Sequence, residues 1–283
     1  MTVKAIDVFA VPSCFTTLPV QIHENERDIA KCEDKILQEL HNIMPQVEIR
    51  PHSKGPQGNF FAYCYPKGLA ERVKLNAEVI ESLWIYDDLI ETLPHDHAAR
   101  LHDELCTLLG EPGMPLKDGQ ASTLELFRGF PPRILAIDPE QGQFVINALK
   151  VYLRQHDSSE TNFQTFDEYV MFRHVNVGFD IMESFMRWDY NIQLSAEEMA
   201  RSQAYRKAAG AAMAFTNDYF SWQSERASTG SRAQNAIPFA MDLYSLTEDH
   251  ARALVKGLVI NAEEETRRLG FELTLNASEA MLR

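Results

Sequence analysis

The chain has 283 residues, of which 45% are hydrophobic and 10% aromatic, so its composition predicts a substantial core and excludes wholesale disorder. Its 27 basic residues fall well short of its 41 acidic ones, and the net charge of −14 argues against a nucleic-acid partner. The four cysteines form no C-x-x-C pair, so we expect reduced thiols. No run of 18 apolar residues predicts a membrane span, and the N-terminus makes a poor signal peptide. We therefore expect a cytoplasmic protein.

Strand signals are nearly absent, and the best strand candidate is the short segment IDVFAVP near the N-terminus. Helical signals are frequent. In chain order, helices are predicted over residues 24–43 and 69–93, after the cap Asp138 with Pro139 at the first helical position, after the capping box Ser195–Glu198, and after the cap signal at 246–249. Polar turn clusters separate them, the most polar at 226–235. None is long enough to be a clear linker, so one all-α domain is the simplest interpretation.

The helix predicted over 69–93 carries acidic residues at the end of its apolar stripe. The stripe consists of Val73, Ala77, Ile80 and Trp84. At helical spacing it runs into Asp87 and Glu91, with Asp88 beside them. Clustered carboxylates repel one another unless a cation neutralises them, and hard oxygen ligands favour Mg²⁺. The alternative is a frayed helix end with solvated acids, since acidic clusters are common.

A second motif, NDYFSWQSE, places an amide, a hydroxyl and a carboxylate four residues apart. Asn217, Ser221 and Glu225 would form a column two helical turns long, as a helix would present three oxygen ligands to one ion. At average residue usage, the pattern N-D-x-x-S-x-x-x-E recurs on the order of once in 10⁵ windows. This motif is therefore specific.

Together with the upstream D-D-x-x-E helix, this motif resembles the class I terpene cyclases. The chain looks most like the cyclase half of fungal terpene synthases, many of which are bifunctional with a prenyltransferase domain. The resemblance covers nearly the whole chain and is strongest at DDLIE, EYVMFRHVNVG and NDYFSWQSE. It implies a class I terpenoid synthase α-helical bundle, one domain over residues 1–283, with a central active-site cavity.

The resemblance also implies three Mg²⁺ ions that bind the diphosphate of an isoprenoid substrate. Asp87 would be the principal ligand on its helix, with Asp88 and Glu91 in supporting roles. The ligands of another ion would be Asn217, Ser221 and Glu225.

Arg173 lies 44 residues before Asn217, close to where family members place an arginine that senses diphosphate. A guanidinium suits phosphate oxygens better than an ammonium, and Arg226 is a further candidate donor. Asn176 and Gly178 stand near the family's acidic linker residue and its small residue at a helix break. The alternative for Arg173 is an interhelix salt bridge. The predicted catalytic residues are Asp87, Arg173, Asn217, Ser221 and Glu225.

Ionisation of an allylic diphosphate creates a carbocation that must be kept from water until its rings have closed. Apolar and aromatic walls can do this, because a ring face attracts a cation. The candidate wall residues are Phe60, Phe61, Trp84, Tyr86, Phe179, Phe185, Trp188, Phe215 and Tyr219. Trp84 and Phe215 are the best candidates, because they precede the two motifs by one turn or less. The fungal resemblance favours geranylgeranyl diphosphate, with geranylfarnesyl diphosphate as the alternative.

The chain departs from the family pattern in two places. It contains no Arg-Tyr pair in the 58 residues after Glu225, from which we expect an incomplete C-terminal helix, and Ser224 stands where a basic residue is often seen. A covalent prenyltransferase domain would lie outside this chain. A homo-oligomer is compatible with the sequence.

Three other functions fit the sequence less well. A prenyl-chain elongating synthase would need a second D-D-x-x-D motif, which is absent. An HD-type phosphohydrolase is hinted at by His95, His97 and His102–Asp103, for which a solvated helix face is the simpler interpretation. In a non-catalytic helical scaffold, both acidic stripes would face solvent.

Overall fold

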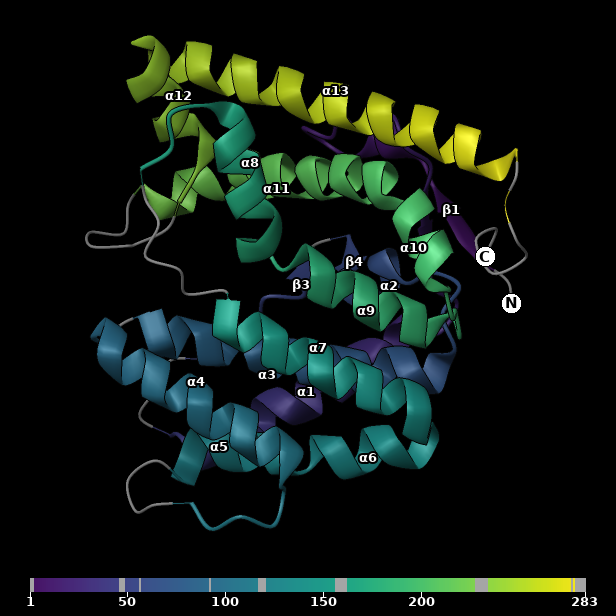
Figure 1. The fold of residues 1–283 in the computed structure, drawn as a ribbon, viewed down its shortest axis with the longest axis vertical. Helices are drawn as coiled ribbons and strands as arrows, with labels where there is room; N and C mark the ends of the chain where they lie inside the picture. Colours follow the sequence, from purple (N-terminus) through teal and green to yellow (C-terminus); the bar gives the residue numbers. More distant parts are fainter. Residues whose placement is uncertain are drawn as a thin grey trace. The chain divides into compact units, whose positions relative to one another are not determined.

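Several helices of the computed structural model begin at a residue whose side chain caps them. The structure describes residues 3–45, 49–55, 57–91, 93–116, 121–155, 162–226, 234–275 and 277. Most described residues are helical, as the all-α prediction requires, and the chain divides into two compact units (Figure 1). The first unit comprises residues 1–10, 19–154 and 181–191, and the second comprises 11–18, 155–180 and 192–283.

The first unit combines two small hairpins with a set of packed helices. Its strands are β1 (Lys4–Ile6), β2 (Val20–Ile22), β3 (Lys54–Gly55) and β4 (Gly58–Asn59), and a 3-10 helix spans Val8–Ala10. Its helices are α1 (Glu26–Ile43), α2 (Phe60–Cys64), α3 (Ala70–Glu91), α4 (His95–Gly110), α5 (Ala121–Arg128), α6 (Phe130–Ile137), α7 (Pro139–Gln155) and most of α9 (Phe179–Asp189). β1 pairs antiparallel with β2, with Lys4 opposite Ile22. The strand expected over residues 6–12 is wrong except at Ile6, because β1 ends there and residues 8–10 form the 3-10 helix.

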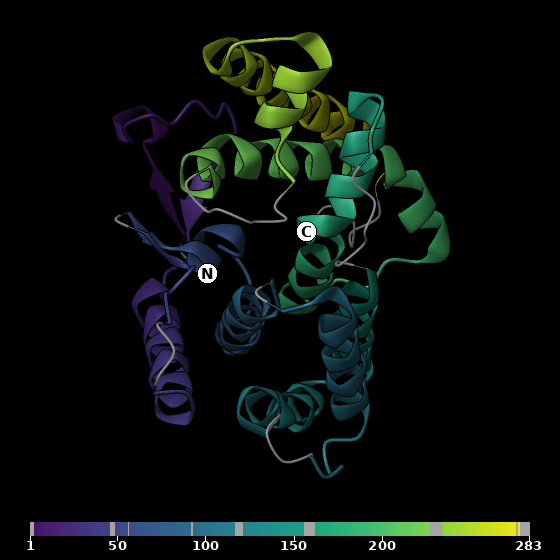
Figure 2. The ribbon, with the colours of Figure 1, turned by 90° about the vertical axis from the view of Figure 1, so that its left-hand side faces the viewer.

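Helix α3 is the core of this unit, and α1 packs along it (Figure 2). Its predicted stripe of Val73, Ala77 and Ile80 is buried. Polar groups tie the end of α9 to α3: the Asn76 amide donates to the Asp189 carboxylate at 2.7 Å. Burial raises the pKa of the Asp189 carboxyl well above its usual range.

The second unit contains α8 (Phe166–Asn176), α10 (Ala196–Arg201), α11 (Gln203–Glu225), α12 (Ala236–Tyr244) and α13 (Glu248–Thr274). Helix α13 lies along α11 and α12, and α8 packs on α11 (Figure 1). The segment 11–18 also belongs here, because Phe15 packs edge-on against Tyr219 at 5.1 Å and the Thr17 backbone N–H donates to Glu263 at 2.9 Å.

The predicted helix starts are confirmed. Asp138 accepts the Gln141 backbone N–H before α7, Ser195 and Glu198 form a reciprocal capping box, and Thr247 caps α13. The predicted turn at 226–235 falls largely on residues 227–233, outside the described residues. None of the helices in the described ranges is both long enough and apolar enough to cross a membrane.

A close approach between α8 and α11 depends on Gly210. A Cβ atom built there would lie 2.1 Å from the Nδ1 atom of His174, whereas a Cβ at Gly257 on α13 would meet nothing within 4 Å. We expect Gly210→Ala to lower the free energy of unfolding by about 1–3 kcal/mol through overpacking. Gly257→Ala should raise it by about 0.5–1 kcal/mol through helix propensity. Urea titration followed by circular dichroism measures both, and equal effects of the two variants would contradict this contact.

Two buried carboxylates hold the loop around β3 and β4. Glu81 on α3 accepts the backbone N–H groups of His52 and Ser53 at 2.8 and 3.2 Å, and Glu33 on α1 accepts the Asn59 amide. Burial raises the pKa of the Glu33 carboxyl from 4.5 to about 7, and none of the described residues hydrogen-bonds its Oε1 atom. The Glu33 carboxylate is therefore costly to ionise in the folded state.

Because its folded pKa lies above its unfolded value, Glu33 contributes stability that is complete below about pH 4.5 and lost as the pH rises through 7. We expect Glu33→Gln to flatten the pH dependence of unfolding free energy in this window and to raise stability at pH 8 by on the order of 1–3 kcal/mol. Denaturant titrations across this range measure the effect. Glu39→Gln, which alters an exposed residue of the same helix, should leave the profile unchanged.

Candidate metal centre

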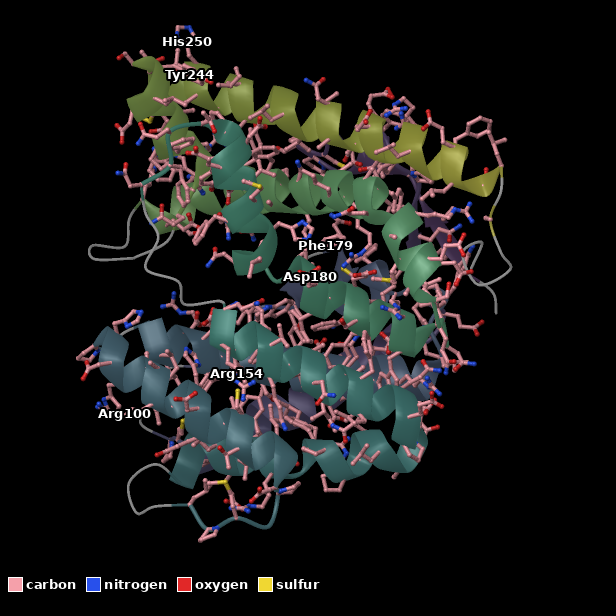
Figure 3. The ribbon with its side chains drawn as sticks, viewed as in Figure 1. Arg100, Arg154, Phe179, Asp180, Tyr244 and His250 are labelled. Carbon is pink, nitrogen blue, oxygen red and sulfur yellow. The ribbon has the colours of Figure 1, made fainter. Side chains whose placement is uncertain are left out.

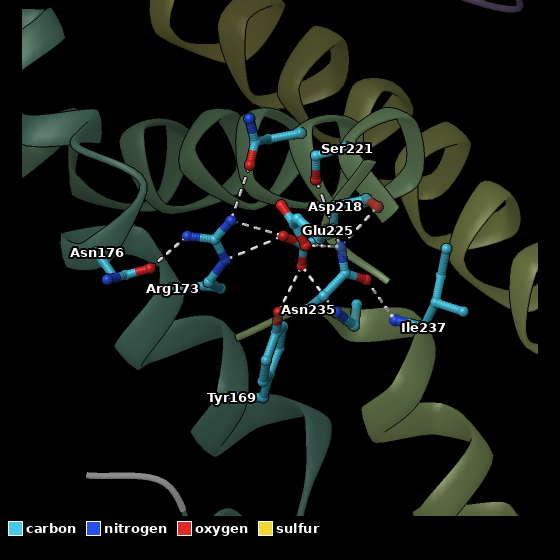
Figure 4. A network of polar contacts seen from close by, with 10 residues as sticks. Tyr169, Arg173, Asn176, Asp218, Ser221, Glu225, Asn235 and Ile237 are labelled. Atoms are coloured by element: carbon cyan, nitrogen blue, oxygen red, sulfur yellow. Dashed lines mark hydrogen bonds and ion pairs between the residues drawn. The ribbon is translucent and has the colours of Figure 1, made fainter. Parts of the chain in front are cut away.

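The three polar residues of the second motif share one face of α11. Asn217, Ser221 and Glu225 follow one another at four-residue spacing near the end of the helix, and Glu225 is its last residue. Their oxygen atoms receive hydrogen bonds from side chains of α8 and of the residue before α12 (Figure 4). The column is therefore hydrogen-bonded to other elements of its own unit, with Asn217 exposed and Ser221 and Glu225 half-buried.

Arg173 on α8 is buried and reaches the top of this column. Its Nη2 atom donates to Asn217 Oδ1 at 2.8 Å and to Asp218 Oδ1 at 2.6 Å, and its Nε atom donates to the same Asp218 oxygen at 3.0 Å. Its Nη1 atom donates to Asn176. The interhelix salt bridge weighed as the alternative for Arg173 is thus present, and its partner is the residue next to Asn217.

Asp218 is fully buried and collects four donors. Arg173 supplies two to Oδ1, while Oδ2 accepts the Tyr169 hydroxyl and, at 3.0 Å, the Ala236 backbone N–H at the start of α12 (Figure 4). Burial raises the pKa of the Asp218 carboxyl, and these donors act in the opposite direction. A negative charge at a helix N-terminus is also favourable. Asp218 therefore fixes α8, α11 and α12 to one another.

Asn235, the N-cap of α12, contacts the second and third residues of the column, Ser221 and Glu225. Its Oδ1 atom accepts the Ile237 backbone N–H at 2.9 Å, which caps the helix. Its Nδ2 atom lies 2.9 Å from Glu225 Oε2, 2.9 Å from the Asp218 carbonyl oxygen and 3.4 Å from Ser221 Oγ. Sequence reasoning assigned no role to Asn235 or Asp218. The cap signal at Asn235 was readable, but its contact with Glu225 depends on tertiary structure.

The first motif lies at the end of α3. Asp87 is half-buried and follows the buried stripe, as predicted, while Asp88 is exposed. The Asp88 Oδ2 atom lies 2.9 Å from His52 Nε2, and this hydrogen bond raises the pKa of His52. The side chain of Glu91 lies outside the described part. His52 is a further residue at this motif that the sequence did not single out.

The predicted wall residues fall into both units. The Phe61 ring stacks on the Trp84 ring with their centroids 5.3 Å apart. The Arg72 guanidinium lies 5.3 Å from the centroid of the buried Trp188 ring. In the second unit, Phe215 packs with Phe166 in an apolar cluster. Their role as a cavity wall stays a prediction.

The predicted helix break is confirmed. α8 ends at Asn176, and Gly178 has a φ of 77°, a conformation that favours glycine. Phe179 and Asp180 follow at the start of α9 (Figure 3). The Phe179 ring packs against the His174 ring with their centroids 4.6 Å apart, and the Asp180 carboxylate accepts a hydrogen bond from Arg206 at 3.0 Å.

Two other sequence-based interpretations can be placed. Arg226, the second candidate diphosphate donor, pairs at the surface with Glu248 at 2.8 Å. The solvated face expected for the α4 histidines is wrong for His102, which is buried with its Nδ1 atom 3.2 Å from the Tyr86 hydroxyl. The apolar side of α4 faces the core there, so His102 is a core histidine.

The donor set of the α11 column fits a hard divalent cation. Amide, hydroxyl and carboxylate oxygens are ligands that Mg²⁺ accepts. Among the described residues, no three His, Cys, Asp or Glu side chains gather as a metal cluster. The column is a different kind of candidate site, because only one of its three oxygen groups is a carboxylate.

The helical fold is that of a class I terpene synthase. The crystal structure of aristolochene synthase from Penicillium roqueforti is similar to this chain with a TM-score of 0.73 at 15% identity, over 96% of this chain and 92% of that one. The family model for terpene synthase family 2, C-terminal metal binding, matches residues 78–265, a range that contains both motifs. The chain therefore belongs to the terpene synthase family, whose members are enzymes, and the scaffold alternative is set aside.

Curated fungal terpene synthases are similar to this chain in sequence. The chain is 29% identical to the sesterterpene synthase btcA of Colletotrichum orbiculare over 93% of its own length and 39% of that protein. It is 28% identical to a cyclopiane-type diterpene synthase of Penicillium chrysogenum over 80% of its length and 31% of that protein. The chain thus spans between 31% and 39% of the length of these two relatives.

The buried pair of Asp218 and Arg173 generates a stability prediction. Asp218→Asn removes the charge that compensates a buried guanidinium, and we expect the free energy of unfolding to fall by about 3–5 kcal/mol. Glu264→Gln, which breaks an exposed pair with Arg267, should have no measurable effect. Denaturant titration compares the two, and a loss below about 1 kcal/mol for Asp218→Asn would show that the pair is not the anchor.

Proposed function

We propose that this chain is a Mg²⁺-dependent terpene cyclase that ionises a linear isoprenoid diphosphate and cyclises the resulting carbocation, releasing diphosphate. Geranylgeranyl diphosphate is the proposed substrate and a polycyclic diterpene the product. The alternative is a sesterterpene cyclase acting on geranylfarnesyl diphosphate. Relatives named as diterpene and sesterterpene synthases support both chain lengths.

One observation carries the proposal: the α11 column presents three different oxygen ligands on one face, with a buried arginine at its end. Asn217, Ser221 and Glu225 would hold one ion, and Asp87 on α3, assisted by Asp88 and Glu91, would hold the others of an expected three. When bound, the ions would neutralise the diphosphate oxygens and stabilise the departing charge.

Arg173 would bind the diphosphate beside the column. Its guanidinium is held rigid by Asp218 and Asn176, so little side-chain entropy is lost when an anion arrives. The guanidinium has five N–H donors in a fixed plane, and those that contact Asn176 and Asn217 would be shared with phosphate oxygens. Arg226 would add a second donor by exchanging its surface partner.

The aromatic residues would shield the cation from water. Trp84 lies on α3 one turn before Asp87, and Phe215 lies on α11 just before Asn217. The face of either ring would attract a carbocation intermediate by about 0.5–2 kcal/mol. Phe61, Phe179 and Trp188 complete the proposed wall.

The proposal extends to the full-length protein. The curated relatives are more than twice as long as the part that this chain matches, which supports a covalently linked prenyltransferase domain that would supply the substrate. The homo-oligomer and the cytoplasmic location stay predictions.

The test is incubation of the purified chain with Mg²⁺ and farnesyl, geranylgeranyl or geranylfarnesyl diphosphate, followed by mass spectrometry of extracted hydrocarbons. We expect a cyclic diterpene from geranylgeranyl diphosphate. Asp87→Ala and Asn217→Ala should each lower turnover by at least about 100-fold, because charge stabilisation at the leaving group is lost. The control Asp96→Ala removes an exposed carboxylate on α4 and should retain activity. Full activity in both motif variants would refute the metal assignment, and a C25 product would favour the sesterterpene alternative.

A further inference from the structure

Asn235 does more than cap a helix. Capping uses only its Oδ1 atom, which accepts the Ile237 backbone N–H, and serine, threonine or aspartate would serve that purpose as well. Its Nδ2 group instead points at α11, where it lies within hydrogen-bond distance of two members of the predicted metal column, Ser221 and Glu225 (Figure 4). The side chain is buried, with 3% of the residue exposed.

The hydrogen-bond count shows how firmly this amide is held. Nδ2 has two hydrogens and three acceptors within reach. The Asp218 carbonyl oxygen and Glu225 Oε2 both lie at 2.9 Å and take one hydrogen each, while Ser221 Oγ, at 3.4 Å, receives a weaker shared contact. With Oδ1 also engaged, the carboxamide cannot turn over without breaking several bonds at once.

Glu225 needs such a partner. As the last residue of α11, it places a negative charge at the helix C-terminus, where the backbone carbonyls disfavour an anion. A glutamate side chain also has several rotamers to lose when it is fixed. The adjacent Arg226 does not compensate it, because its guanidinium donates to Glu248. Among the residues that the structure describes, the Asn235 amide is the donor that orients Glu225.

We propose that Asn235 is a positioning residue of the metal site, whose amide holds the Glu225 carboxylate and the Ser221 hydroxyl in place for a divalent cation. This inference rests on the proposed function of the α11 column. A carboxylate has about four lone-pair positions, so an oxygen that accepts the amide still has a free direction for a metal ion. Partners that orient metal ligands in this way typically change metal affinity by 10–100-fold when they are removed.

The variant that isolates this role is Asn235→Ser. Serine retains a capping oxygen for α12 but is too short to reach Glu225. The backbone at Asn235 is extended, with φ −137° and ψ 137°, so Asn235→Thr fits equally well and serves as a second variant. Thr247→Ala, which removes the cap of α13 in the same unit, is the matched control for loss of a cap away from the column.

The measurement is titration with Mn²⁺ in the presence of inorganic diphosphate, in which electron paramagnetic resonance reports the free ion. We expect Asn235→Ser and Asn235→Thr to weaken Mn²⁺ binding by about 10–100-fold, while their thermal unfolding temperatures change no more than that of Thr247→Ala. The Mg²⁺ concentration for half-maximal turnover should rise in proportion, with kcat largely restored at saturating metal.

Two outcomes separate the inference from the function on which it rests. If wild type and Asn217→Ala bind Mn²⁺ equally, the α11 column is not the metal site, and both proposals fail. If Asn217→Ala loses binding but the Asn235 variants bind as wild type does, or more tightly, the column stands and the positioning role of Asn235 is refuted.

Discussion

The buried carboxylate of Asp218 is the interaction on which the second unit depends. Asp218 lies on α11 and accepts hydrogen bonds from Tyr169 and Arg173 on α8 and from Ala236 on α12. A buried charge is tolerated only when it is paired and fully hydrogen-bonded, and each oxygen of Asp218 has two donors. Because these donors come from separate elements, the cost of burial is offset only in the complete fold. The same contacts fix the direction of Arg173 and the first turn of α12.

Local chemistry accounts for what the sequence could predict. Asp138, Ser195 and Thr247 cap their helices through atoms only a few residues away, so their roles follow from short-range spacing. The column on α11 follows in the same way from four-residue periodicity. The break at Gly178 was predicted from the family resemblance and is confirmed by the positive φ of that residue.

Tertiary contacts account for what the sequence could not predict. His102 was predicted to lie on a solvated face because its helix is rich in polar residues. In the structure it is buried and forms a hydrogen bond with the Tyr86 hydroxyl on α3. Asn235 was recognisable as a cap, yet its second role depends on Glu225, ten residues earlier on another helix. Asp218 was part of the specific motif, but its partners Tyr169 and Arg173 lie more than forty residues away. Spacing along one helix does not determine which side chain of another helix meets it.

The charge of Arg173 would couple the binding of a divalent cation at the column to the binding of diphosphate. The Arg173 guanidinium lies 2.8 Å from Asn217 Oδ1, an oxygen proposed to face a divalent cation. Two positive groups around one oxygen repel each other, most strongly in a site shielded from water. A diphosphate that contacts both would turn this repulsion into attraction, because its oxygens can accept from the guanidinium and bind the ion simultaneously. Asn235, which carries no charge, orients Glu225 without adding to that repulsion. With the neutral Asn235 at one end of the column and the charged Arg173 at the other, the column would bind a divalent cation weakly without diphosphate and strongly with it.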